Sequence, residues 1–416
     1  MRARSLLLVA ALTCPVDSFV NVHLTRLTTS KKQWERPAVV STPEKKAVAL
    51  PKKKLPPIPA DELFGMGFTR WRMQQAARHP EVAELELLMA SIAEAVKAVA
   101  GFVRVAGVPD YGEGLDPRGL SVATLGMGRR HNDHARRILE VALRVSGKLG
   151  VIACEMRPPA LVDQGFGEYV ATFAPMVGAS GLDAGVPTGT IFGVFKDDGR
   201  DDCVVDPDSM SDPVKQEEEC LLRTLQPGTH LICAGYGMYS SSCELILAVK
   251  GEGVHGFTLD SHVGEFVLTN PYMTIPKRGK LYSLDESRRA TWRDPLRTHV
   301  DILRDGKGQS GTRYSYRYIG STVGDFHRTM VYGGIWGRPD TDIGVDAFGG
   351  DRTGGLTILG EAAPLSFIAE EAGGLARDGR GRPVLELQPK SLSERTGLFV
   401  GGEDDIRELE CVLVQG

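Results

Sequence analysis

The amino-acid sequence predicts a layered α/β sandwich, and three observations support this fold class. Two amphipathic helical patterns open the folded part of the chain, a series of short apolar strand patterns follows, and the last third alternates helices with strands. Such a mixture is typical of sheets that are covered by helices on both faces. A chain of 416 residues is long enough for two ordinary domains or one large α/β unit.

The N-terminal segment differs from the rest of the chain. Residues 1–16, MRARSLLLVAALTCPV, have a charged start and a short apolar run, as in signal-type segments. Residues 19–60 are basic and poor in acidic residues, and they end in PKKKLPPIPA. This combination resembles the two-part presequences that direct proteins into plastids bounded by extra membranes. A secretory signal with a disordered linker and a mitochondrial presequence are the alternatives. We expect residues 1–60 to be a plastid-targeting presequence outside the fold.

Two helices are expected at the start of the folded region. Residues 80–107 carry apolar side chains at spacings of three and four, which indicates a long amphipathic helix. A loop rich in Gly, Pro and Asp follows. Residues 131–148 then form a second helical pattern, in which Asn132 or Asp133 could cap the first turn.

Short apolar runs predict the strands that follow these helices. They are bounded by Gly, Pro and polar clusters, as strands usually are. The acidic stretch at 196–224 is expected to be an inserted surface loop. The predicted strands are 151–155, 169–177, 189–195, 230–238, 243–250, 253–260 and 264–270.

The last third of the chain alternates helical and strand patterns. Helices are expected at 323–334 and 364–374, and strands at 354–362 and 381–390. We divide the folded region into an N-terminal α/β domain at 61–243, which contains the loop at 196–224, and a C-terminal α/β domain at 244–416.

Composition excludes several classes of protein. A formal net charge of −4 gives no electrostatic reason to expect binding to nucleic acid or to an anionic membrane. No run approaches the roughly 20 apolar residues that a membrane span needs. Seven cysteines in a chain of this length do not indicate a disulfide scaffold, although they allow one specific redox pair.

Several stretches together resemble one family, the class I fructose-1,6-bisphosphatases, and the plastid form in particular. The resemblance covers roughly residues 62–416. It implies a homo-oligomer of five-layer αβαβα subunits that uses magnesium to hydrolyse the 1-phosphate of a sugar bisphosphate. The stretches are GTIFGVF (189–195), LQPGTHLICAGYGMYSSS (225–242), GVHGFTLDSHVGEFVLTN (253–270), IPKRGKLYSLDES (275–287), RYIGSTVGDFHRTMVYGGIWG (317–337) and EAAPLSFIAEEAGG (361–374).

The resemblance places the metal ligands of the family at positions that this chain has largely changed. The family uses an acidic pair after one strand, and these positions are Glu155 and Met156 here. Its DPLDGSS turn provides two aspartates, and Ala174 and Val177 occupy their places. A later glutamate is retained as Glu361.

An aspartate that the family places before its second helix corresponds to Asn132 or Asp133. Magnesium prefers hard oxygen ligands, so we expect at most about one weakly held ion. Glu155, Glu361 and Asp133 are the candidate ligands, and relic or structural carboxylates are the alternative for the two glutamates. Replacement ligands from other loops are a further alternative, with Asp110, Glu113, Asp163 and Asp183 as the acids available.

The resemblance also implies a phosphate-binding site. Arg317 and Tyr318 match an Arg-Tyr pair that grips the far phosphate, with the arginine reaching a neighbouring subunit. His255 is expected in place of an asparagine and Arg338 in place of a tyrosine, although a solvated surface arginine is the alternative for Arg338. Gly355 takes the place of a lysine. Ser180, which remains from the metal turn, is a further candidate phosphate ligand. Tyr236, Tyr239 and His327 are expected to be core residues.

The acidic loop carries two cysteines that match the redox loop of plastid family members. A disulfide between Cys203 and Cys220, reduced by thioredoxin, would regulate activity. The alternative is two unpaired surface thiols, because the acidic surroundings would raise the pKa of a thiol.

Three functions are open at this stage: an active phosphatase with a rebuilt or single-metal site, a sugar-phosphate-binding relative with weak or lost activity, and a structural interaction protein. The missing carboxylates favour the second. Its expected partners are a sugar bisphosphate and either copies of itself or an active paralogue.

Overall fold

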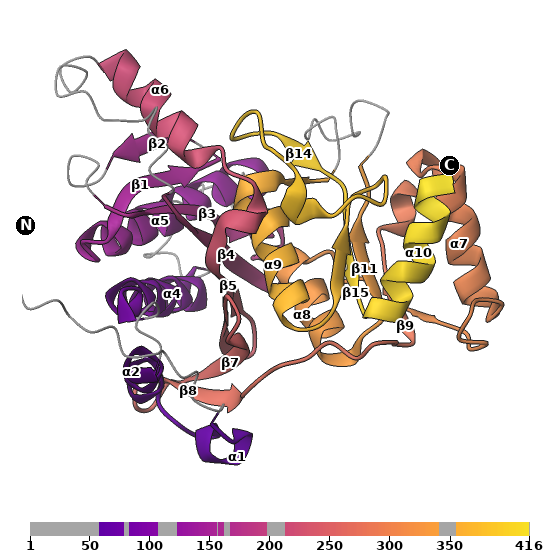
Figure 1. Cartoon of the computed structure of the whole chain (residues 1–416), viewed down its shortest axis with the longest axis horizontal. Helices are drawn as coiled ribbons and strands as arrows, with labels where there is room; N and C mark the ends of the chain where they lie inside the picture. Colours follow the sequence, from indigo (N-terminus) through magenta and orange to yellow (C-terminus); the bar gives the residue numbers. More distant parts are fainter. Residues whose placement is uncertain are drawn as a thin grey trace, which may run out of the picture. The chain divides into compact units, whose positions relative to one another are not determined.

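The computed structural model describes residues 58–78, 83–106, 123–155, 157–161, 167–197, 213–340 and 355–415. Leu55–Gly416 forms one compact unit. Within this unit, two large sheets and three groups of helices form five layers in the order αβαβα (Figure 1). The predicted fold class is therefore confirmed.

The larger sheet has eight strands in the order β2-β1-β3-β4-β5-β6-β7-β8. Strands β1 and β3 are parallel, and every other neighbouring pair is antiparallel. Strands β3 to β6 are buried along nearly their whole length. The strands are β1 Leu149–Cys154, β2 Arg157–Leu161, β3 Tyr169–Val177, β4 Thr188–Lys196, β5 Leu231–Tyr239, β6 Cys243–Val249, β7 Gly253–Asp260 and β8 Glu265–Asn270.

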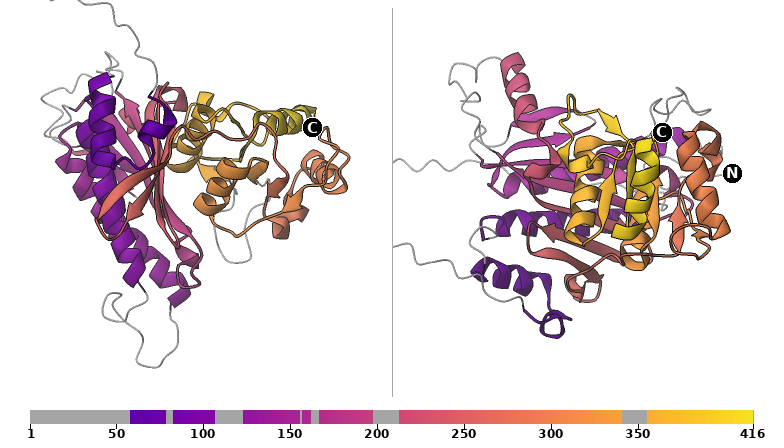
Figure 2. Two further views of the ribbon diagram at one scale, coloured as in Figure 1. Left: turned by 90° about the horizontal axis from the view of Figure 1, so that it is seen from below. Right: turned by 45° about the vertical axis from the view of Figure 1, so that its right-hand side comes forward.

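Helices from the N-terminal part cover one face of this sheet. In α4 the buried side chains Leu88, Met89, Ile92, Val96 and Val99 recur at spacings of one, three and four, which places them on one face toward the strands. Figure 2 shows these helices in indigo and purple beside the sheet. The helices are α1 Ala60–Leu63, α2 Phe68–Arg78, α4 Glu86–Val105 and α5 Ala123–Val145.

Two helices, α8 (Thr322–Tyr332) and α9 (Ala363–Glu371), lie between the sheets. Helix α9 is buried along most of its length, and α8 is buried except for its last turn, since apolar side chains face them from each side. In the N-terminal part, α6 (Pro213–Thr224) packs near the edge strands β1 and β2.

The second sheet has five strands in the order β10-β9-β11-β15-β13. Its outer face is covered by α7 (Asp294–Asp305) and α10 (Glu403–Gln415), with a separate apolar cluster beneath them. The strands are β9 Leu281–Ser283, β10 Ser315–Tyr316, β11 Ile335–Arg338, β13 Leu375–Arg377 and β15 Leu398–Gly401.

A two-stranded ladder, β12 (Leu356–Thr357) with β14 (Arg395–Thr396), lies beside the start of α9. The chain continues from β12 into the π-helical turn η7 (Ile358–Ala362). The described ranges also contain four 3-10 turns: η2 Ala179–Gly181, η5 Gly228–His230, η6 Glu286–Thr291 and η8 Val384–Glu386. Among the described residues, no helix is long and apolar enough to cross a bilayer.

Four predicted elements differ from the structure. The helix expected at 131–148 begins at Ala123, so Asn132 and Asp133 lie inside α5 and do not cap its first turn. The strand expected at 354–362 is, over its described residues, mostly the turn η7, because the Glu361 carboxylate accepts a hydrogen bond from the Thr357 amide and bends the chain back. Residues 381–390 contain η8 instead of a strand, and the prolines there lack the donors that a ladder needs. Part of the acidic insertion is the helix α6.

The division expected between residues 243 and 244 falls inside the eight-stranded sheet, because β6 begins at Cys243. Predicted strand 169–177 coincides with β3. Predicted strands 253–260 and 264–270 agree closely with β7 and β8.

Candidate functional site

The residues expected to hold metal converge at one edge of the large sheet. Strands β1 and β3 are parallel, with Cys154 paired to Phe173, so Glu155 and Ala174 follow at neighbouring positions. The turn η7 packs on β3 beside them, and the Thr172 hydroxyl donates to the Leu359 carbonyl at 2.9 Å. The sheet therefore brings Glu155, Ala174 and the η7 segment that carries Glu361 to the same place.

Glu155 is bound by an arginine that the sequence did not indicate. The Arg395 Nη1 lies 3.3 Å from the Glu155 Oε1. The Arg395 Nη2 also donates to the backbone carbonyl of Gly355 at 3.2 Å. Arg395 is on β14, so a guanidinium from the C-terminal part of the chain neutralises the carboxylate at the end of β1.

Glu361 is buried and its carboxylate accepts two protein donors. The Thr357 amide donates to the Glu361 Oε2 at 3.1 Å, and the Thr357 hydroxyl donates to the same oxygen at 3.2 Å. These bonds stabilise the η7 turn. Glu361 therefore has a structural role in addition to any role as a ligand.

The remaining positions of the expected metal site provide few oxygen ligands. Ala174 is buried in the apolar cluster between the sheets, and Val177 packs against that cluster. Asp133 accepts a bond from the Arg136 Nε at 3.4 Å on α5. Asp183 is exposed in the turn after η2. Burial lowers the pKa of His131, and the charge of Asp183 opposes part of this shift.

Some of the expected residues lie outside the described part of the chain: Met156, Asp110, Glu113 and Asp163. Within the described ranges, no three His, Cys, Asp or Glu side chains form a group that could hold a metal ion. Magnesium in a two-metal site needs several hard oxygen ligands around each ion. The described side chains do not fit such a site, because the two glutamates already have protein partners and the residue between them is an alanine.

A pocket opens next to this edge, on the second sheet. It contains two of the predicted phosphate ligands, Tyr318 and Arg338, together with the glycine that replaces the expected lysine. The lining residues are Asp285, Arg288, Trp292, Tyr318, Gly337, Arg338, Pro339 and Gly355.

Charged groups of both signs surround the Tyr318 phenol. Burial raises the pKa of Tyr318, Asp285 raises it further, and Arg338 lowers it. Arg288 lies 3.6 Å from Asp285, measured between Nε and Oδ2, and the Arg338 Nη1 donates to the Thr322 hydroxyl at 3.5 Å. The pocket thus combines two guanidinium groups and a phenol, which are suited to phosphate, with one carboxylate that limits the positive charge.

Asp285 and Arg288 were missed in the sequence. Both follow β9, with Asp285 inside the stretch IPKRGKLYSLDES that carries part of the family resemblance and Arg288 directly after it. A carboxylate directly after a predicted strand is a signal that could have identified Asp285. Residues 275–287, however, show no clear alternation of apolar and polar side chains, so no strand was predicted there.

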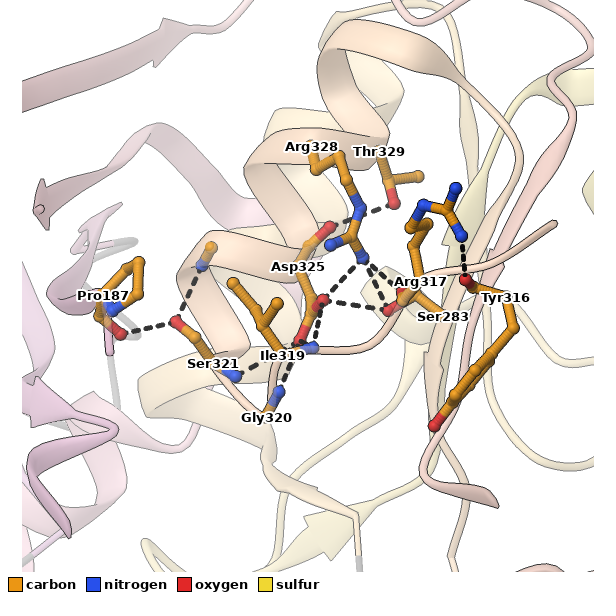
Figure 3. Close-up of polar contacts among 11 residues, drawn as sticks. Pro187, Ser283, Tyr316, Arg317, Ile319, Gly320, Ser321, Asp325, Arg328 and Thr329 are labelled. Carbon is orange, nitrogen blue, oxygen red and sulfur yellow. Dashed lines mark hydrogen bonds and ion pairs between the residues drawn. The ribbon is translucent and has the colours of Figure 1, made fainter. Parts of the chain in front are cut away.

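The segment that carries Tyr318 is held by a buried carboxylate, as Figure 3 shows. Asp325, near the start of α8, accepts bonds from three successive backbone amides: Ile319 at 3.1 Å, Gly320 at 3.1 Å and Ser321 at 3.2 Å. The Ser283 hydroxyl and the Arg328 guanidinium also donate to it. This arrangement fixes the backbone directly after Tyr318.

Two further contacts connect this segment to its surroundings. The Arg328 Nη2 donates to the Arg317 carbonyl at 2.6 Å, and the Ser321 hydroxyl donates to the Pro187 carbonyl at 2.7 Å. Pro187 ends the turn that begins after β3. The segment that carries Tyr318 and the turn between β3 and β4 are therefore directly linked.

Arg317 and Ser180 are not among the pocket-lining residues. Arg317 is exposed, and its Nη1 donates to the Tyr316 carbonyl at 2.7 Å. Ser180 is exposed in η2, on the turn between β3 and β4.

His255 lies in the core and not in the pocket. It is 1 % exposed on β7, with ring centroids 5.1 Å from Trp71 and 4.8 Å from Tyr272. Trp71 belongs to α2, so His255 faces the outer helical layer on the side of the sheet away from α8. The expectation that His255 replaces a phosphate-binding asparagine is wrong for this reason.

Other aromatic and imidazole groups have the predicted core roles. Tyr236 and Tyr239 are buried on β5, and the Tyr236 hydroxyl lies 2.7 Å from the His327 Nδ1. Burial lowers the pKa of His327 and raises that of Tyr236. His327 therefore belongs to a buried hydrogen-bonded pair.

Of the predicted redox pair, Cys203 lies outside the described residues. Cys220 is 2 % exposed on α6 and belongs to the apolar cluster between the sheets. It is not a surface thiol, because α6 packs on β1 and β2 with Cys220 on its buried side.

Comparisons with known proteins agree with this architecture. Residues 66–271 match the fructose-1-6-bisphosphatase N-terminal domain, and residues 275–414 match the fructose-1-6-bisphosphatase C-terminal domain. Chloroplastic fructose-1,6-bisphosphatase from Brassica napus is 40% identical over 355 residues, covering 83% of this chain and 81% of the relative. The corresponding protein from Spinacia oleracea is 39% identical over 357 residues, covering 83% and 80%.

A solved structure shows the same fold. The holo form of Leishmania major fructose-1,6-bisphosphatase superposes with a TM-score of 0.68 at 30% sequence identity, covering 84% of this chain and 99% of that one. The two domain matches, the identity to the chloroplastic relatives and the five layers lead to one conclusion: the chain belongs to the fructose-1,6-bisphosphatase family and is of the plastid type.

Proposed function

We propose that this protein binds a sugar bisphosphate, with fructose 1,6-bisphosphate as the closest candidate, and that its phosphatase activity is weak or lost. The pocket of Tyr318, Arg338 and Arg288 receives one phosphate. Arg317 stands beside it at the surface, where it can reach a neighbouring subunit.

The observation that carries the proposal is the set of contacts at the sheet edge where the metal ligands were expected. Glu155 is paired with Arg395, Glu361 is bonded to Thr357, and the buried Ala174 lies between them. Losing a bridging carboxylate from a two-metal site typically costs several kcal/mol of transition-state stabilisation, or about 100-fold or more in rate. Magnesium, the metal of the family reaction, would be held weakly or not at all.

The second candidate is an active plastid fructose-1,6-bisphosphatase with a rebuilt or single-metal site. The identity to the chloroplastic enzymes and the presence of Glu155 and Glu361 at one edge favour it. Ligands from Asp183 or from Asp110, Glu113 and Asp163, which lie outside the described residues, would complete that site.

Regulation, assembly and location form part of the same proposal. A Cys203–Cys220 disulfide reduced by thioredoxin would act on the acidic loop. A homo-oligomer, or an assembly with an active paralogue, would complete the phosphate site. Residues 1–60 would direct the chain to the plastid. The similarity to chloroplastic relatives supports the plastid location.

The test is phosphate release from fructose 1,6-bisphosphate with magnesium, with and without dithiothreitol. We expect a rate at least about 100-fold below that of an active family member under both conditions. A rate within about tenfold of the active enzyme contradicts the proposed loss and supports the second candidate.

Restoring the carboxylates tests the cause. The triple variant Met156→Glu, Ala174→Asp and Val177→Asp should gain about 100-fold or more in rate, because it returns hard ligands to the edge. Adding Glu361→Gln to that variant should abolish the gain. A triple variant that folds, binds the bisphosphate and stays inactive points to Arg338 and Gly355 as further causes.

A further inference from the structure

Arg395 occupies the space between the pocket and the expected metal edge. Its Nη2 donates to the carbonyl of Gly355, a residue that lines the pocket, and its Nη1 lies 3.3 Å from Glu155. One guanidinium therefore connects the binding pocket with the carboxylate that the family resemblance assigns to metal.

The β12–β14 ladder sets this position. Thr357 pairs with Arg395 across the antiparallel ladder, so the donors to Glu361 and to Glu155 come from the same rung. The Thr357 amide and hydroxyl donate to the buried Glu361 carboxylate at 3.1 Å and 3.2 Å. The Arg395 guanidinium therefore contacts Glu155, whose side chain is 37 % exposed to solvent.

We propose that Arg395 binds the second phosphate of a sugar bisphosphate whose first phosphate occupies the pocket of Tyr318 and Arg338. This inference rests on the proposed function, and it assigns to a guanidinium the charge neutralisation that a metal ion would otherwise give. Arg395 exchanges its contact with Glu155 for the phosphate, and no covalent step is involved.

The chemistry of the pair allows this exchange. The contact of 3.3 Å is long for a charge-assisted hydrogen bond, and the Glu155 side chain is 37 % exposed, whereas that of Arg395 is 17 % exposed. Water can therefore solvate the Glu155 carboxylate when the guanidinium leaves it. A phosphate monoester carries more negative charge than a carboxylate and accepts two parallel bonds from a guanidinium. The bond to the Gly355 carbonyl keeps the guanidinium in place while its partner changes.

Calorimetric titration of the full chain in EDTA tests the proposal with two probes, fructose 1,6-bisphosphate and fructose 6-phosphate. The wild-type protein should bind the bisphosphate about tenfold or more tightly without metal, since a hydrogen bond to a charged group is worth at least that factor. The Arg395→Ala variant should lose this preference and bind fructose 6-phosphate as the wild type does. That unchanged binding also shows that the variant is folded.

Two further variants separate a phosphate ligand from a structural arginine. Glu155→Gln should strengthen bisphosphate binding about threefold or more, because the guanidinium no longer has to leave a carboxylate. Arg395→Lys should keep part of the preference for the bisphosphate, since lysine keeps the positive charge but lacks the two parallel N–H donors of a guanidinium. The controls are Arg407→Ala and Glu403→Gln, which break a more exposed pair on α10 with a contact of 2.9 Å and should change neither affinity.

Three outcomes overturn the inference. Arg395→Ala could retain the full preference for the bisphosphate, or the wild type could show the preference only when magnesium replaces EDTA. In either case fructose 6-phosphate binding still supports the proposed function. If the wild type binds neither probe, the proposed function falls together with this inference.

Discussion

At the scale of the residue, His255 makes stability depend on pH. Burial lowers its pKa to about 4, against 6.5 in an unfolded chain. Between these values the unfolded chain binds a proton that the folded protein does not. Its contribution is therefore fully present above about pH 6.5 and is lost as the pH falls toward 4, by about 3 kcal/mol in all.

The His255→Gln variant removes this titration while it keeps an acceptor near the Tyr272 amide, which donates to the His255 Nδ1 at 3.4 Å. Between pH 7.5 and 4.5, its free energy of unfolding should fall less than that of the wild type by about 2 kcal/mol. Urea denaturation at both pH values measures the difference. The exposed His262→Gln serves as the control, and an equal acid sensitivity of both variants would contradict the assignment.

Single residues also show how far the sequence predicts the site. Tyr318 and Arg338 were identified because they lie in long stretches shared with the family, and the structure brings both into one pocket. Arg395 was missed because its contact with Glu155 joins positions 240 residues apart, and no local pattern encodes such a pair. His255 was placed wrongly because a strand position does not reveal which face of the sheet it occupies.

At the scale of the element, α8 depends on Asp325. Its buried carboxylate accepts the three amides that precede the helix and pairs with Arg328, so it positions Tyr318. In Asp325→Asn the amide group would face those backbone donors. We expect the free energy of unfolding to fall by about 3 kcal/mol, and fructose 6-phosphate affinity to fall about tenfold.

Chemical denaturation and calorimetric titration measure these two effects. The control is Asp305→Asn, whose exposed carboxylate beside Lys307 should change the free energy of unfolding far less. Unchanged ligand affinity in a folded Asp325→Asn protein would show that Asp325 stabilises α8 without positioning the pocket.

Elements of sufficient length were predictable, and short ones were not. Strands β3, β7 and β8 were found from their apolar patterns, because six or more residues define a period. Strands β9 to β15 have two to four residues each, which is too few for a pattern. Helix α6 was missed because its acidic sequence resembles a loop. The structure shows that the helix begins at Pro213 and that Cys220 lies on its buried face.

At the scale of the whole molecule, the layered unit should fold without the N-terminal segment. Leu55–Gly416 forms one compact unit with three buried apolar clusters. A protein that begins at Leu55 should therefore melt within about 3 °C of the full chain. Differential scanning calorimetry of both proteins measures this. A melting temperature lower by more than about 10 °C would show that the segment contributes to the stability of the fold.

The five layers were implied by the family resemblance, whereas composition and periodicity alone indicated an α/β sandwich without the number of layers. The difference arises because layer order depends on which faces of α8 and α9 contact which sheet. Helix α9 is buried over its first seven residues, and α8 carries polar residues such as Asp325 and Arg328 that serve local contacts, so neither sequence shows which face meets which sheet.

The burial of Ala174 limits how catalysis could evolve at this edge. The residue is 6 % exposed within an apolar cluster, so an aspartate at this position alone would be an uncompensated buried charge. Such a variant would lose stability. The carboxylate could be accommodated only if a cation, such as a metal ion held by further carboxylates, came with it, so the order of mutations, and not their number, would decide whether this edge can hold a metal ion.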